Sequence, residues 1–340
     1  MIKDENLKRR VTIYQVAKES GYSLATISRV INNKDNVTED TKRKVHEVIE
    51  RLGYKPSAIA QGLAKSKSTN IGIVVPSAMS TYVSAMLSGM VETAKIYGYQ
   101  TTLFVTTKKE EEANDVVESV ISSNVDGAVI FDDELSSEAL DKLVNYSVPL
   151  AVIGREIDNE NIASIPLDFN AAIKTAVNDH FQRYTEDIIF LRWNQGGNLM
   201  KNVEETARKE CERIGKAHQF KTIEVEDSYS KTYEQFKKLF SEEGLRGFII
   251  APRDSISSGV ANAASECEVR IPEDIQILSV IGTKYSKIVR PSLTSFDIDM
   301  YEVGSIAMRM LTKLLSGNLK TKVYPFVSTI EHRSSTRIKK

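Results

Sequence analysis

The sequence predicts a small helical domain followed by a larger α/β core of two doubly wound subdomains. Three observations lead to this fold class: short amphipathic helices at the N-terminus, a change of pattern near residue 70, and a length of 340 residues. At roughly 100–200 residues per domain, that length indicates two or three domains. The hydrophobic fraction of 41% is ordinary for a globular protein, so disordered and fibrous classes are excluded.

Three short helices are predicted within the first 55 residues. Each begins at a hydroxyl residue suited to N-capping, and these caps are Thr12, Ser23 and Thr38. Gln15 completes a capping-box pattern in the first helix, and Gly21 ends it. The second helix runs from about Leu24 to Asn32, and the third ends at Gly53. Three short helices with a tight turn between the first two are typical of a helix-turn-helix domain.

From Asn70 onward, apolar runs of strand length alternate with amphipathic stretches of helix length. The apolar runs cover residues 71–75, 101–105, 128–131, 150–153, 188–191, 248–251 and 275–281. The helical stretches cover residues 85–97, 113–122, 170–182, 229–240 and 255–264. Continuous Val- and Ile-rich runs bounded by helices indicate parallel strands buried on both faces, joined by right-handed crossovers. We therefore expect two parallel sheets rather than one.

Composition and motifs exclude several classes of protein. No stretch reaches the roughly 18 uninterrupted apolar residues of a membrane helix, and the charged first residues are not an export signal. Cys211 and Cys267 lie far apart without zinc-ligand spacing, which favours a reduced, cytoplasmic protein. The four histidines lack metal spacing, and the common nucleotide-binding and hydrolase motifs are missing. We expect no metal, no cofactor and no enzymatic activity.

Charge is distributed unevenly along the chain. Residues 1–67 hold 14 Lys and Arg against 8 Asp and Glu, a net charge of +6. The remaining residues hold 31 against 38, a net charge of −7. A basic domain attached to an acidic body indicates a polyanionic partner for the N-terminal domain, although a merely solvated basic face gives the same count.

The most specific signal lies in three runs of the helical domain, TIYQVA at 12–17, SLATISRVIN at 23–32 and RLGYKP at 51–56. These runs closely resemble the LacI/GalR family of bacterial repressors, and the similarity extends over about residues 11–335. The resemblance implies a homodimer that binds double-stranded operator DNA. It divides the chain into a headpiece at 1–55, a hinge at 56–69, and a periplasmic-binding-protein-like core. The first core subdomain is expected at 70–167 and 295–322, the second at 168–294 and 323–340.

The start of the second helix is expected to read bases in the major groove. The residues expected there are Ser23, Leu24, Ala25, Thr26 and Arg29. Leu24 and Ala25 suit thymine methyl groups, and Arg29 can pair bidentately with guanine. The alternative for Leu24 is a core position, and for Arg29 a phosphate contact only. The residues expected to contact the DNA backbone are Thr12, Tyr14, Ser28 and Asn32.

In this family the hinge folds when two subunits meet on the operator, and its leucine opens the central base step from the minor groove. The matching residues here are Ser57, Ala60 and Leu63. An apolar wedge that unstacks a base step and kinks the duplex is a known minor-groove device.

The family also places an effector in the cleft between the core subdomains. Tyr82, Arg155 and Asp254 are the expected cleft residues, but Thr283 and Lys284 stand where an aspartate is usual. These departures weaken recognition of a sugar or nucleoside, because selectivity needs matched polar groups.

The resemblance is strongest to family members that act in carbon catabolite control, whose corepressor is the serine-phosphorylated phosphocarrier protein. Arg290 and Arg309 match arginines of the corepressor surface on the first subdomain. The planar guanidinium suits phosphate, since it makes two parallel charge-assisted bonds. The alternatives are an ordinary surface ion pair at these positions, and control by a small sugar or nucleoside.

Overall fold

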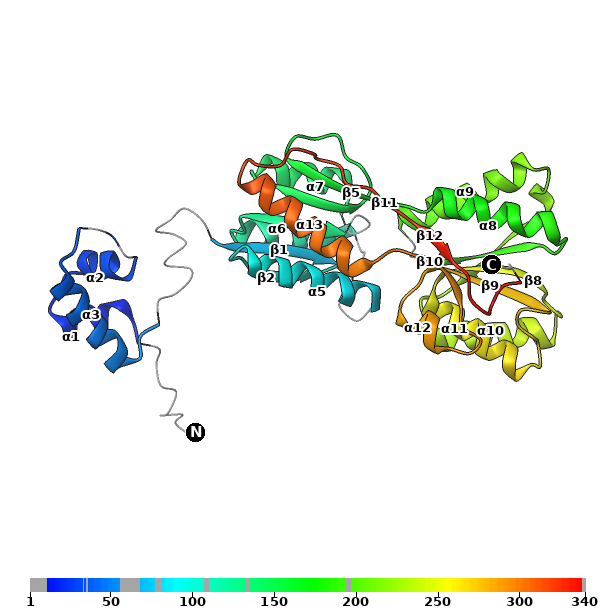
Figure 1. The fold of residues 1–340 in the computed structure, drawn as a ribbon, viewed down its shortest axis with the longest axis horizontal. Coiled ribbons are helices and arrows are strands. Elements are labelled where there is room, and N and C mark those ends of the chain that lie inside the picture. The colour runs from blue at the N-terminus through cyan, green and yellow to red at the C-terminus, as the bar shows by residue number, and fades with distance from the viewer. Residues whose placement is uncertain are drawn as a thin grey trace. The chain divides into compact units, whose positions relative to one another are not determined.

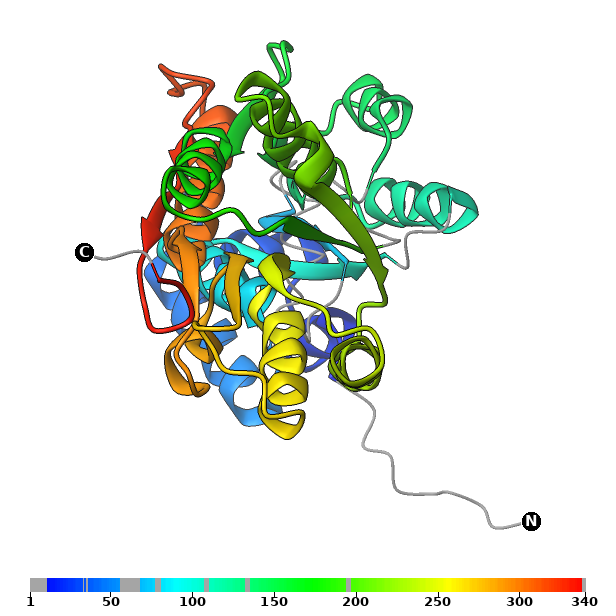
Figure 2. The same cartoon turned by 90° about the vertical axis from the view of Figure 1, so that its right-hand side faces the viewer.

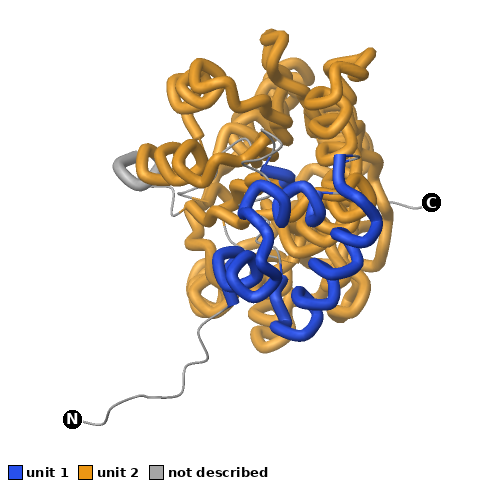
Figure 3. Tube along the Cα trace, turned by 90° about the vertical axis from the view of Figure 1, so that its left-hand side faces the viewer, with its two compact units in different colours: residues 1–69 blue, residues 70–340 orange. Residues whose placement is uncertain are grey.

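The computed structural model describes residues 11–337 except 33, 35, 56–67, 77–80, 107–109, 132–134 and 194–196. The chain divides into two compact units, residues 1–69 and residues 70–340 (Figure 3). The boundary coincides with the change of pattern in the sequence. The hinge residues Ser57, Ala60 and Leu63 lie outside the described residues.

Unit 1 holds three helices, α1 (Ile13–Ser20), α2 (Leu24–Ile31) and α3 (Glu39–Leu52). Their ends confirm the predicted caps. The Thr12 amide donates to Gln15 Oε1 at 2.8 Å, and Gly21 and Gly53 end α1 and α3 with φ of 74° and 66°. Glycine suits these left-handed positions because it has no Cβ. The core of the unit is formed by Val16, Ile27, Val30 and Val45, all at most 1% exposed.

Unit 2 begins with a six-stranded sheet in the order β11-β5-β4-β3-β1-β2. Its strands are β1 (Asn70–Val75), β2 (Gln100–Val105), β3 (Gly127–Phe131), β4 (Leu150–Gly154), β5 (Ile162–Asp168) and β11 (Phe326–Val327). All its strand pairs are parallel. The helices are α5 (Thr81–Ile96) and α13 (Met300–Leu315) on one face, and α6 (Glu110–Ser122) and α7 (Ser137–Asn145) on the other (Figure 1).

A second sheet follows in the order β12-β10-β9-β8-β6-β7, parallel except for β10 and β12. Its strands are β6 (Ile188–Trp193), β7 (Phe220–Val225), β8 (Gly247–Arg253), β9 (Ile275–Ile281), β10 (Thr294–Asp297) and β12 (Thr329–Glu331). The helices are α8 (Asn170–Arg183), α9 (Asn198–Arg213), α10 (Tyr229–Ser241), α11 (Asp254–Glu266), α12 (Lys284–Ile288) and the 3-10 helix η2 (Ala217–Gln219). Helices α8 and α9 cover one face, α10 and α11 the other (Figure 2). The two predicted doubly wound sheets are confirmed.

Three crossings join the subdomains, and two of them lie later in the chain than expected. Strand β10 pairs with β9 and β12 and belongs to the second sheet up to Asp297, so the crossing assigned to residue 295 is wrong. Residues 323–327 are expected in the second subdomain, but Phe326 pairs with Leu167 of β5 in the first. Strand β10 has four residues and β11 has two, which is too short for a recognisable sequence pattern. Only their pairing with strands far away in the sequence shows to which sheet each belongs.

Helices α5 and α13 cross at unusually short range in the first subdomain. A Cβ built on Gly304 would lie 2.0 Å from the Met86 carbonyl oxygen, and one on Gly89 would lie 2.1 Å from the Tyr301 carbonyl oxygen. Ser305 Oγ donates to the Gly89 carbonyl across the contact at 3.4 Å. Glycine therefore permits this helix pair to pack backbone against backbone.

Candidate DNA-binding surface and core cleft

The N-terminal end of α2 is built by its cap. The Thr26 amide donates to Ser23 Oγ at 3.2 Å, and the hydroxyl groups of the two residues are 2.9 Å apart. This cap satisfies a free amide of the first turn and fixes where the helix begins. The cap thereby sets the direction in which the next side chains project.

One face of α2 is core and the other is exposed. Ile27 and Val30 are buried, whereas Leu24 is 38% exposed and Ala25 and Arg29 are exposed. The core alternative for Leu24 is therefore wrong, because the core of unit 1 is complete without it. An exposed apolar residue beside an exposed arginine at the start of a helix has the chemistry of base readout in a major groove.

The expected backbone-contacting residues lie on α1 and at the end of α2. Thr12 and Tyr14 are exposed, Tyr14 by 69%. Asn32 ends α2, and its Nδ2 donates to the Ser28 carbonyl oxygen at 2.8 Å. The side-chain amide of Asn32 therefore already caps the C-terminal end of α2.

Asp254 has a different role from the one expected. It is 2% exposed, and its Oδ2 accepts from the amide and hydroxyl of Thr283 at 2.7 and 2.6 Å. The amide and hydroxyl of Ser286 donate to the same oxygen, both at 3.2 Å. Asp254 is thus an internal anchor for the start of α12, and its assignment to the effector cleft is wrong. Thr283 donates hydrogen bonds to Asp254, whereas an aspartate at position 283 would repel it.

We expect Asp254→Ala to lower the free energy of unfolding by about 2–4 kcal/mol, because it leaves several buried donors without an acceptor. Urea denaturation of the full chain measures this value. Glu118→Ala is the matched control, since Glu118 is 64% exposed and ion-paired with Lys142 at 2.6 Å, and such a surface pair contributes about 0–1 kcal/mol. Equal losses in the two variants would contradict the anchoring role.

Tyr82 does face the cleft, together with residues that sequence reasoning missed. It is 7% exposed on α5, packs on Phe131 with ring centroids 6.1 Å apart, and lines a pocket of about 660 Å³ together with Lys287 and Arg333 of the second subdomain. Arg253 is ion-paired with Asp227 and stacks on Trp193 at 4.8 Å. Burial lowers the pKa of Arg253. The position of Arg253 at the end of a strand, beside Asp254, is the feature of the sequence from which it could have been predicted.

The other candidate arginines do not join this group. Arg155 lines a separate recess against α7, of about 210 Å³, with Leu140 and Asp141. Arg290 lies between α12 and β10 of the second subdomain, where its Nη1 donates to the carbonyl oxygens of residues 287–289. Its expected place on the first subdomain is therefore wrong. Arg309 is exposed on α13 of the first subdomain, as expected.

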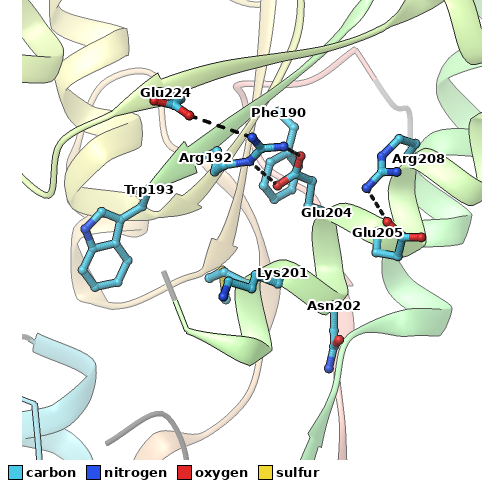
Figure 4. Close-up of a pocket in the computed structure, with 10 residues that line it drawn as sticks. Phe190, Arg192, Trp193, Lys201, Asn202, Glu204, Glu205, Arg208 and Glu224 are labelled. Carbon is cyan, nitrogen blue, oxygen red and sulfur yellow. Dashed lines mark hydrogen bonds and ion pairs between the residues drawn. The ribbon is translucent and has the colours of Figure 1, made fainter. Parts of the chain in front are cut away.

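A pocket of about 720 Å³ lies between α9 and the β6–β7 edge (Figure 4). Arg192 of β6 donates to both carboxylate oxygens of Glu204, and Arg208 pairs with Glu205. Burial alone would raise the pKa of Glu204, but its hydrogen bond and attraction to Arg192 outweigh that effect and lower it. The charges of these two pairs are already compensated, so we assign the pocket no charged ligand.

No cluster of potential metal ligands occurs among the described residues, and none of their helices is long and apolar enough to span a membrane.

A helix-turn-helix headpiece on a core of two doubly wound subdomains defines a DNA-binding regulator. Residues 12–57 match the family model "Bacterial regulatory proteins, lacI family", and residues 182–336 match "Periplasmic binding protein-like domain". The chain belongs to the lacI family of bacterial transcription regulators.

Relatives cover nearly the whole chain. The HTH-type transcriptional regulator pepR1 of Lactobacillus delbrueckii subsp. lactis is 31% identical over 312 residues, 91% of this chain and 92% of that protein. Catabolite control protein A of Staphylococcus epidermidis is 29% identical over 333 residues, covering 96% and 99%. The crystal structure of the lac repressor dimer bound to operator and the anti-inducer ONPF shares the fold, with a TM-score of 0.80, 21% identity and coverage of 96% and 99%. These relatives are named as a transcriptional regulator, a catabolite control protein and a repressor.

Proposed function

We propose that the chain acts as a homodimer that reads a pseudo-palindromic operator through α2. The exposed Leu24, Ala25 and Arg29 on a capped helix carry this proposal. Thr12, Tyr14, Ser28 and Asn32 position the helix on phosphates, and the hinge residues Ser57, Ala60 and Leu63 enter the minor groove between the half-sites.

Exposed apolar side chains support a twofold dimer through the first subdomain. Val91 and Ile96 of α5 are 45% and 82% exposed, and Leu103 and Val105 of the neighbouring edge strand β2 are 44% and 48% exposed. An exposed edge strand with apolar side chains is a surface that a second copy can cover. Sedimentation of the chain at micromolar concentration should therefore give a dimer.

Selection of DNA from a random pool by the purified chain tests the proposal. The expected product is a site with twofold symmetry and a flexible central step, because two headpieces read two half-sites and the hinge kinks the middle. An asymmetric selected site would overturn the dimeric reader. Selection repeated with and without the serine-phosphorylated phosphocarrier protein shows whether a corepressor changes affinity.

A role in carbon catabolite control is the finer part of the proposal. It is supported by the similarity to catabolite control protein A and by the exposed Arg309 on α13. Binding of the phosphorylated carrier to the first subdomain would favour one arrangement of the dimer, and by linkage operator DNA would raise the affinity for the carrier by the same factor.

We expect Arg309→Met to weaken binding of the phosphorylated carrier by about tenfold to a hundredfold, because a charge-assisted phosphate contact is lost. Titration calorimetry measures the effect. Arg290→Met is the matched control, since Arg290 lies in the other subdomain and bonds its own loop. Absence of binding heat for the native chain, or equal losses in both variants, would contradict this corepressor surface.

A further inference from the structure

The pocket of about 660 Å³ beside Tyr82 lies where the two core subdomains meet. Helix α5 of the first subdomain and helix α12 of the second both line it. Residues 297–299, which connect β10 to α13 and so join the two subdomains, also line it (Figure 1). Its volume lies within the roughly 300–1,000 Å³ of small-molecule sites. A ligand in this pocket therefore contacts both subdomains.

The part of the lining that belongs to α12 is cationic. Lys284 and Lys287 line the pocket and are exposed, and neither is ion-paired with a described residue. Arg333 also lines it, but its charge is compensated by Glu331 at 3.5 Å. The buried Asp254 holds the start of α12, so the two lysines stand on a fixed element. Two uncompensated ammonium groups attract an anionic group of a ligand.

The rest of the polar lining offers hydrogen-bond acceptors. Ser84 and Ser88 lie one turn apart on the same face of α5. Their hydroxyl groups donate to the carbonyl oxygens of residues 81 and 84, at 2.8 and 3.0 Å, so their lone pairs remain for a ligand. Asp297 and Asp299 add carboxylates, and that of Asp297 is bonded to no described residue. Such acceptors bind an ammonium group more strongly than a neutral hydroxyl.

We propose that this pocket binds a small zwitterion, an amino acid or a short peptide. Its carboxylate contacts Lys284 and Lys287 of the second subdomain, and its ammonium group contacts the acceptors of α5 and of the connecting residues. Uncompensated charges of both signs distinguish this pocket from the one beside Glu204, whose ion pairs are complete. A ligand that contacts both subdomains stabilises their closed arrangement. The proposal goes beyond operator reading, and its tests need no DNA and no corepressor.

Four forms of dialanine separate the two charges of the ligand. The free dipeptide is a zwitterion, its N-acetyl form is an anion, its C-terminal amide is a cation, and the doubly blocked form is neutral. Titration calorimetry with the full chain should show binding of the free dipeptide. Each singly blocked form should bind about tenfold more weakly, because one charge-assisted contact is lost. An N-acetyl form or an amide that binds as tightly as the free dipeptide would overturn the proposal.

Two variants assign each charge of the ligand to its part of the lining. The double variant Lys284→Met, Lys287→Met should remove the preference for the free dipeptide over its amide. Asp297→Asn should instead reduce the preference for the free dipeptide over its N-acetyl form. These side chains are exposed, so both variants should fold like the native chain. Lys174→Met is the matched control, because Lys174 is an exposed lysine of the same subdomain that lies outside the pocket.

Small-angle scattering and thermal melting report the effect of binding on the core. The free dipeptide should make the native chain more compact and raise its melting temperature, because it binds only the folded core and bridges its subdomains. Absence of binding of the free dipeptide at millimolar concentration would overturn the proposal. So would an equal loss of affinity in Lys174→Met, or a neutral or phosphorylated sugar that binds the native chain more tightly than the dipeptide.

Discussion

Gly304→Ala is expected to lower the free energy of unfolding by about 3 kcal/mol or more, because the added methyl group forces two helix backbones apart. A Cβ at this position would lie 2.0 Å from the Met86 carbonyl oxygen and 3.1 Å from Met86 Cα. Neither atom belongs to a flexible side chain, so relief requires movement of α5 or α13 as a whole. Urea denaturation followed by circular dichroism measures the loss.

The matched control is Gly259→Ala. Gly259 also lies inside a helix, and its Cβ would lie 3.0 Å from the Tyr229 carbonyl oxygen and 3.3 Å from Thr232 Cβ. Both substitutions gain the same helix propensity, about 1 kcal/mol, so their difference isolates the steric term. Gly304→Ala should be clearly less stable than Gly259→Ala. Equal stabilities would show that α5 and α13 can separate without loss.

Arg29→Met should reduce affinity for the selected operator about a hundredfold. A bidentate contact between arginine and guanine contributes about 1–3 kcal/mol of discrimination, and a symmetric dimer makes it twice. Arg29 is exposed, so folding of the headpiece should be unaffected. Fluorescence anisotropy at constant salt, with specific and random duplexes, measures the change.

The control for this experiment is Arg43→Met, which removes one positive charge from the exposed side of α3. Arg43 pairs with Asp40 at 2.7 Å and is 68% exposed. Its loss should weaken specific and nonspecific binding by similar small factors. Arg29→Met should instead lower the ratio of the affinity for the specific duplex to that for the random duplex. A uniform loss on both duplexes would reduce Arg29 to a phosphate contact.

Local chemistry explains why much of this fold could be predicted. The caps at Thr12, Ser23 and Thr38 and the terminating glycines act within a few residues, so their signals stand in the sequence itself. The buried parallel strands are readable because both of their faces must be apolar. The exposed face of α2 follows from the same helical period that buries Ile27 and Val30.

Arg253 and Asp254 show what only the tertiary structure decided. These neighbours end a strand and begin a helix, and their side chains contact different groups: Arg253 contacts Asp227 and Trp193, and Asp254 accepts hydrogen bonds from Thr283 and Ser286. Likewise, pairing with Leu167 places Phe326 in the first sheet. The residue types alone determined the headpiece, its caps and the two-sheet class, because those depend on short-range periods. Which polar groups fill the cleft depended on contacts between residues far apart in the chain, and no local pattern encodes them.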